Sequence, residues 1–86
     1  MTIKELDKCI YNAIIKNKKF IGFVIKADYS NDKEIHIIPI SNITDKLAFI
    51  YNNYDHDNLT NTILKDRKID DCIFGDSFSE LQSKMR

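Results

Sequence analysis

Four side chains of this sequence could bind a transition metal, and their number matches that of a Cys2His2 zinc site. They are two cysteines and two histidines, namely Cys9, His36, His56 and Cys72. Structural zinc sites usually take their ligands as close pairs, such as two cysteines separated by two residues. Here each of the four stands alone in a different part of the chain. The spacing argues against zinc, and we expect Cys9 and Cys72 to be reduced thiols in the core.

A second group with reactive chemistry is the triplet Asp55-His56-Asp57, in which two carboxylates flank an imidazole. Such a triplet could hold a divalent cation or raise the pKa of the histidine. It differs from a calcium-binding EF-hand loop, because Leu59 and Thr60 stand where an oxygen ligand and a glycine are required. We therefore interpret residues 55–62 as a solvated, mobile loop and predict no metal site.

Sequence motifs for catalysis and for cofactor binding are absent. The chain contains no nucleophile elbow, Walker loop or dinucleotide-binding fingerprint, and its two glycines are too few for a loop that cradles phosphate. With 86 residues it also offers little material for the walls of a catalytic cleft. We therefore predict a protein that is not an enzyme, has no catalytic residue and takes no cofactor.

Charge disfavours nucleic acid as the partner. The chain has 13 basic and 13 acidic residues, and it thus lacks the net positive charge that strengthens binding to a polyanion. Basic residues do cluster at two places, and tyrosines could stack on bases. A nucleic-acid-binding regulator, which we keep as an alternative, would use Lys16, Lys18, Lys19, Lys65, Arg67 and Lys68.

A protein partner is favoured by the acidic composition of the C-terminal half. From Asp55 to Glu80 seven acidic residues stand against three basic ones, a balance of −4. Such a surface would complement a basic groove on a protein that handles nucleic acid, and aromatic side chains often anchor such contacts. The predicted partner-binding residues are Tyr51, Tyr54, Asp55, Asp57, Asp70 and Asp71.

The elements that position these residues follow from the hydrophobic pattern. Apolar residues recur at steps of three and four within residues 2–18, which predicts an amphipathic helix that begins with a capping box. Two runs rich in β-branched and aromatic residues, 20–27 and 34–40, flank a polar turn and predict a β-hairpin. Gly22 indicates either a bulge or a point where a neighbouring group lies close.

The second half of the chain adds three more elements. Helical spacing is favoured within 43–54, a third strand is predicted at 69–74, and a second capping box begins a short helix at Ser77. The order α-β-β-α-β-α predicts an α+β fold, with a small, mainly antiparallel three-stranded sheet and helices packed on one face. No repeat and no linker divides the sequence, so we expect residues 1–86 to form a single domain.

Targeting signals and apolar spans are also missing. No apolar run approaches the roughly 18 to 20 residues that cross a bilayer, and residues 1–7 lack the features of a signal peptide. We therefore expect a cytoplasmic protein without a membrane partner. A chain this small has a limited core, so a homodimer through an exposed strand edge, acting as a self-assembling accessory subunit, is a further alternative.

Three segments together resemble a class of known proteins. The N-terminal amphipathic helix, the hairpin strand FIGFVIKA and the closing segment FGDSFSELQ resemble small proteins of phages and prophages in AT-rich Gram-positive bacteria. The excess of 15 Ile over 5 Leu and of 11 Lys over 2 Arg agrees with AT-rich codons. The resemblance implies that the protein is a stoichiometric inhibitor of a host protein. The target would be a nucleic-acid-handling defence complex such as CRISPR-Cas, which anti-CRISPR proteins inhibit. The resemblance assigns no functional residue.

Overall fold

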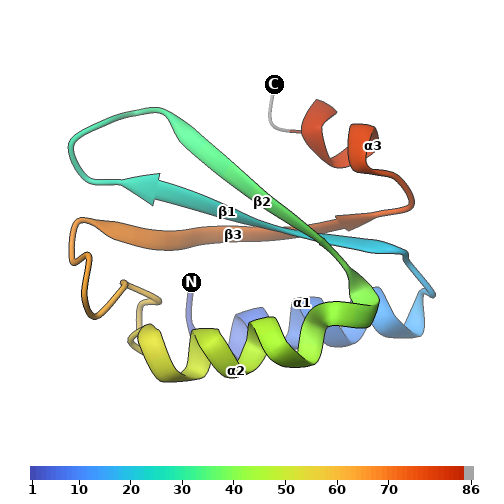
Figure 1. Ribbon diagram of the computed structural model, residues 1–86, viewed down its shortest axis with the longest axis horizontal. Helices are drawn as coiled ribbons and strands as arrows, with labels where there is room; N and C mark the ends of the chain where they lie inside the picture. Colours follow the sequence, from blue (N-terminus) through green and yellow to red (C-terminus); the bar gives the residue numbers. More distant parts are fainter. Residues whose placement is uncertain (85–86) are drawn as a thin grey trace.

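Three antiparallel strands form one sheet in the order β2-β1-β3, in a computed structural model that describes residues 1–84 (Figure 1). A 3-10 turn, η1, precedes the second helix. The order of elements and the antiparallel sheet confirm the predicted α+β fold. The elements are α1 (Ile3–Ile15), β1 (Phe20–Ala27), β2 (Lys33–Pro39), η1 (Ile40–Asn42), α2 (Ile43–Asn53), β3 (Arg67–Gly75) and α3 (Phe78–Ser83).

The central strand β1 is covered on both faces. Its residues 21–25 are buried without interruption, although successive side chains of a strand point to opposite faces. Ile21, Phe23 and Ile25 join the main hydrophobic core with side chains of α1 and α2. We call this the inner face of the sheet, and the opposite one, onto which Val24 points, the outer face. Burial on both faces explains why the sequence of β1 is a continuous apolar run rather than an alternating one.

The helices divide between these two faces. α1 and α2 lie side by side under the inner face, whereas α3 lies over the outer face (Figure 1). The expectation that helices pack on one face therefore holds for the two long helices, and α3 differs from it. The reason is that the chain turns at Gly75 and places Leu81, fully buried, against the end of β3. Leu81 thus covers apolar outer-face surface that α1 and α2 cannot reach.

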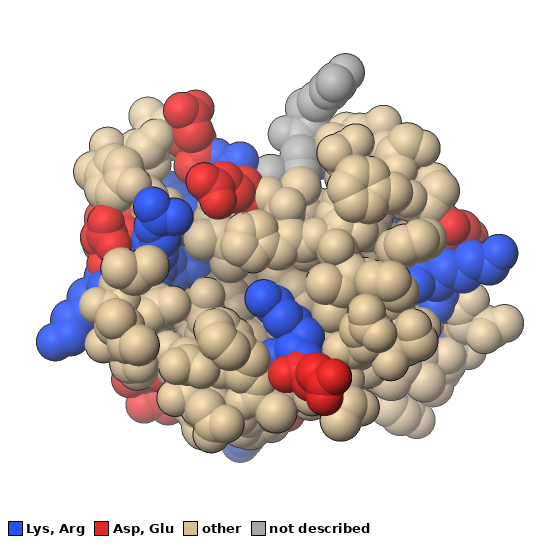
Figure 2. All heavy atoms as spheres, viewed as in Figure 1, with Lys and Arg blue, Asp and Glu red and all other residues tan. Residues whose placement is uncertain are grey.

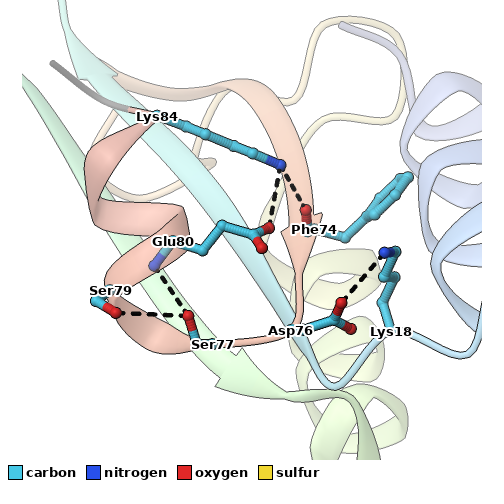
Figure 3. A network of polar contacts seen from close by, with 7 residues as sticks. All are labelled: Lys18, Phe74, Asp76, Ser77, Ser79, Glu80 and Lys84. Carbon is cyan, nitrogen blue, oxygen red and sulfur yellow. Dashed lines mark hydrogen bonds and ion pairs between the residues drawn. The ribbon is translucent and has the colours of Figure 1, made fainter.

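Polar contacts fix the short helix α3 to the end of the sheet (Figure 3). The Ser77 hydroxyl accepts a hydrogen bond from the backbone N–H of Glu80 at 3.1 Å, which is the capping interaction that the sequence predicts. Lys84 donates to the carbonyl oxygen of Phe74 at 2.9 Å and lies 3.5 Å from the Glu80 carboxylate. A helix of this length depends on such contacts, because it has few internal hydrogen bonds.

Residues 55–62 are anchored to the sheet rather than free in solvent. Leu59 has no exposed surface and belongs to the main core. Its carbonyl accepts a hydrogen bond from the N–H of Ile69 in β3, and Asn61 donates to the carbonyl of Arg67, both at 2.9 Å. The segment therefore covers the first half of the free edge of β3, on the side away from β1. Burial of its single leucine holds the segment against the sheet.

Gly22 lies where a neighbouring side chain approaches β1 closely, which confirms the second of its two predicted roles. A Cβ atom at this position would lie 2.8 Å from Cδ1 of Ile35 in β2 and 3.4 Å from Cγ1 of Ile73 in β3. The bulge is elsewhere, because Val24 pairs with Asp71 whereas Ile25 pairs with Ile69. The absence of a side chain at Gly22 leaves room for the side chains of the two flanking isoleucines close to the central strand.

We expect Gly22→Ala to lower the free energy of unfolding by about 1 kcal/mol, because the new methyl group overlaps with Ile35. Ile35→Val removes the overlapping Cδ1 atom. The Ile35→Val change should therefore cost less stability in the Gly22→Ala background than in the wild type. Urea unfolding of the four proteins measures this coupling, and strictly additive changes would show that the two side chains do not compete for space.

Candidate functional site

The structure separates the candidate metal ligands into three places. Cys9 of α1 meets Cys72 of β3, and its Sγ atom donates to the Cys72 carbonyl oxygen at 3.2 Å. His36 lies on β2, 3.6 Å from Glu34, and His56 lies in the loop that follows α2. Within residues 1–84, no three His, Cys, Asp or Glu side chains converge as metal ligands.

The two cysteines are reduced and pack in or beside the core, as predicted. Cys72 is buried, and the interaction of its thiol with the Cys9 side chain, together with burial, raises its pKa well above the usual range of a thiol. The same interaction between the two side chains favours the Cys9 thiolate and lowers the pKa of Cys9, which is only half-buried. Thiolate character and access therefore favour reaction at Cys9 over Cys72.

The acidic residues of the C-terminal half do not gather into one surface. Asp70 lies 2.9 Å from Lys33, and this hydrogen bond holds the pKa of the carboxyl below its usual value. Asp71 uses Oδ1 to accept a hydrogen bond from the N–H of Cys72 at 2.8 Å. Acidic and basic side chains also lie next to one another on the face shown in Figure 2. Further ion pairs join Asp76 to Lys18 and Glu80 to Lys84.

Four of the predicted partner-binding residues lie at the end of α2 or just after it. Tyr54 is half-buried against the core. Asp55 and Asp57 are both exposed, and Asp55 Oδ1 accepts a hydrogen bond from the Asp57 N–H at 2.8 Å. Tyr51 has a different environment, because it lines an open groove. Asp70 and Asp71 lie on β3, so the structure does not bring the six residues together.

This groove runs between α1 and α2 on the side of the helices away from the sheet. Its volume is about 540 Å³, and most of its surface is apolar. α1 supplies Ile10 and Ile14, of which Ile14 is 53% exposed. The polar groups of its wall are the side chains of Thr44 and Asn52. The remaining lining residues, all on α2, are Ile43, Leu47, Ala48 and Tyr51.

One end of the groove is closed by a hydrogen bond between the two helices. The Tyr51 hydroxyl donates to Oδ2 of Asp7 at 2.6 Å. This bond raises the pKa of Tyr51, because the bond and the negative charge of the carboxylate both favour the protonated phenol. His56 packs edge-on against the Tyr51 ring, with 5.1 Å between ring centroids, and its Nε2 lies 2.9 Å from the Tyr51 carbonyl. Tyr51 is therefore held in place from two sides.

The loop after α2 brings further negative charge to this end of the groove. The N–H of Ile3, the first residue of α1, donates to the carbonyl of His56 at 2.9 Å. Asp55 and Asp57 flank that histidine and are exposed. The groove therefore has an apolar floor and a polar end with Asp7 and these two carboxylates nearby.

Comparisons with family models, with curated proteins and with solved structures give no match for the chain. None of the helices within residues 1–84 is long and apolar enough to cross a membrane. What the groove can do must therefore be derived from its own residues. They offer apolar surface for burial and a few hydrogen-bonding groups, which is the chemistry of a contact surface.

Alkylation should distinguish the two thiols. We expect iodoacetamide to modify Cys9 in the native protein at pH 8 at least about tenfold faster than Cys72, because Cys72 is buried with a raised pKa. Peptide mass spectrometry after timed quenching gives both rates. Addition of denaturant should make the two rates similar, whereas equal rates in the native protein would contradict the burial of Cys72.

Titration of Tyr51 tests the bond that closes the groove. Asp7→Asn should lower the pKa of Tyr51 toward that of a free tyrosine, because the phenol loses the carboxylate that favours its protonated form. The chemical shift of the ring carbon bearing the hydroxyl follows this titration by NMR. Asp45→Asn, a change at an α2 residue outside the bond, is the control. An unchanged Tyr51 titration in Asp7→Asn would show that the bond does not form in solution.

Proposed function

We propose that this protein binds one host protein in a stoichiometric complex and inhibits it, and that the groove between α1 and α2 receives an amphipathic helix of that partner. The observation that carries the proposal is the open, apolar groove between two helices, with carboxylates at one end. That the partner is a nucleic-acid-handling defence protein such as a CRISPR-Cas component rests on the sequence resemblance to small phage proteins.

Burial of apolar surface would supply most of the affinity. Complete burial of an isoleucine side chain contributes roughly 1.5 to 3 kcal/mol relative to its exposed state. Ile14 is about half exposed, and Leu47 and Ile43 are partly exposed along the same groove. Burial of the remaining exposed surface of each residue by a partner would therefore contribute part of that free energy to binding. The entropic cost of association must be subtracted from this contribution.

The shape and charge of the groove indicate which kind of partner segment fits. α1 has 13 residues, so the groove is at most roughly 20 Å long, about the length of three to four helical turns. A helix laid there would present apolar residues at spacings of three and four, as helix-in-groove complexes do. Asp7 keeps Oδ1 outside its bond with Tyr51, and Asp55 and Asp57 lie near the same end. We therefore expect a lysine or arginine at the corresponding end of the partner helix.

The two remaining predicted partner-binding residues, Asp70 and Asp71, lie on β3, away from the groove. Asp71 is opposite Val24 in the register of β1 and β3, which places it on the outer face, away from the groove. Asp70 is already paired with Lys33. In this proposal Asp70 and Asp71 act as a separate acidic contact, and a variant that reverses both charges tests them independently of the groove.

A matched pair of variants tests the groove. Ile14→Glu places a charge in the groove wall, whereas Ile63→Glu places the same charge at a 76% exposed isoleucine outside it. In pull-downs from host lysate we expect one protein to be retained in equimolar amount by the wild type and by Ile63→Glu. Ile14→Glu should lose at least about 90% of it, because a buried, unpaired carboxylate costs several kcal/mol.

Inhibition is then measured with the purified partner. Its activity should fall to completion near one molar equivalent of the wild-type protein and remain unchanged with Ile14→Glu. Retention of the partner by Ile14→Glu, or full activity of the partner in the complex, would exclude the proposal. Loss of binding only in the Asp70→Lys, Asp71→Lys variant would move the contact to the outer face, and recovery of nucleic acid alone would favour the regulator.

A further inference from the structure

One edge of the sheet is open. β2 pairs with β1 on one side, and within residues 1–84 no hydrogen bond reaches its backbone from the other side. The opposite edge, on β3, is occupied along much of its length. Leu59 and Asn61 bond to its first half, Cys9 bonds to the carbonyl of Cys72, and Lys84 bonds to the carbonyl of Phe74. The fold therefore protects one edge and exposes the other.

The register of the hairpin shows which backbone groups of β2 point outward. The N–H of Ile40 donates to the carbonyl of Lys19 at 2.9 Å, next to the paired residues Ile38 and Ile21. Hydrogen-bonded pairs alternate along an antiparallel ladder, so every second residue of β2 directs its backbone groups to β1. The residues between them direct theirs to solvent, and these are Lys33, Ile35, Ile37 and Pro39.

We infer that β2 pairs with β2 of a second copy of this chain, antiparallel, with Ile35 opposite Ile35 on the two-fold axis. This register uses the outward N–H and C=O groups of Lys33, Ile35 and Ile37. None of the three is a proline, so each can donate a backbone hydrogen bond. A shift by one residue in each copy would bring Pro39, which has no N–H, opposite Lys33, so the added pair on each side would form only one hydrogen bond. The two registers then form the same number of hydrogen bonds, and the side-chain pairs decide between them.

Side chains in this register are complementary. On the inner-face side, Glu34 of each copy lies opposite His36 of the other, in the pairs whose side chains approach most closely. Both side chains are exposed, Glu34 to 66% and His36 to 50%, and they lie 3.6 Å apart within one chain, so each would exchange this contact for the one across the axis. On the outer-face side, Ile35 meets its own copy, which extends the apolar strip that Ile35 and Ile73 form over Gly22.

α2 adds apolar surface on the same side of the molecule. Phe49 is 51% exposed and is absent from the groove, whose α2 residues face α1. α1 packs against β3, at the protected end of the sheet, so the side of α2 that carries Phe49 faces the β2 edge. In Figure 1 both α2 and β2 lie in front of α1, and Figure 2 shows much uncharged surface on this side, with a basic and an acidic side chain near its centre. The dimer contact would thus bury Phe49 in addition to the strand edge.

This inference does not rest on the proposed function. The groove lies between α1 and α2, whereas the β2 edge lies beyond α2, so one molecule can use both surfaces. A two-fold axis perpendicular to the sheet would form a continuous six-stranded sheet with the helices of both copies under its inner face. Each dimer would then present two grooves.

Complementary charges at Ile35 test both the dimer and its register. Light scattering after size exclusion should give the wild type a mass near twice 10.1 kDa at about 1 mM and a falling mass on dilution. Ile35→Lys and Ile35→Glu should each remain at the monomer mass, because the axis places like charges opposite each other. An equimolar mixture of the two variants should recover the dimer mass.

Three results would overturn the inference. They are a wild type that stays at 10.1 kDa, single variants that still dimerise, and a mixture that stays monomeric.

If circular dichroism shows that the variants do not fold, amide exchange of the wild type tests the pairing instead. The N–H groups of Ile35 and Ile37 should then exchange at least about tenfold more slowly at high than at low protein concentration. Rates independent of concentration would exclude the pairing. Ile14→Glu, in the groove, should dimerise like the wild type.

Discussion

Burial of β1 on both faces is the constraint on which the other elements depend. Five consecutive apolar positions, 21–25, must be covered from two directions and hydrogen-bonded along two edges. α1 and α2 satisfy the inner face, and the approach of Ile35 and Ile73 over Gly22, with Leu81 nearby, satisfies the outer one. The two edges of the sheet differ. Loop and side-chain hydrogen bonds occupy much of the β3 edge, whereas within the described residues 1–84 the β2 edge has none.

The sequence was sufficient to predict the elements and their order, because each has a distinct period. The bounds of β1 were predicted to the residue, the capping box of α1 is complete, and at Ser77 the half of the box in which the hydroxyl accepts from the Glu80 N–H forms. Two features depended on tertiary contacts and were not predictable. Leu59 lies in the core although the residues around it in the sequence are polar and predict an exposed loop. α3 packs on the outer face because of the direction of the turn after Gly75, and hydrophobic periodicity does not predict the direction of a turn.

The candidate site was predictable only in part, for a similar reason. A local excess of acidic residues is a property of the sequence, whereas an acidic surface requires that those residues share a face without basic neighbours. Asp70 and Lys33 are 37 positions apart in the chain and form an ion pair. Tyr51 was identified as an anchor from its residue type alone. The groove beside it depends on the separation between α1 and α2, so Ile14, which the helical pattern assigns to the core, is instead half exposed.

The pairing of β1 with β3 has a consequence for the order in which the chain can become structured. Phe20 pairs with Gly75, 55 residues later, whereas the hairpin of β1 and β2 needs only a short turn. α1 and the hairpin precede β3 along the chain, so during synthesis the strand FIGFVIKA keeps an unpaired, apolar edge until residues 67–75 have been added. During that interval both edges of the hairpin are open, and the edge of β1 is accessible to other chains in addition to that of β2. Early pairing of β3 with β1 would shorten the time during which this apolar edge is exposed.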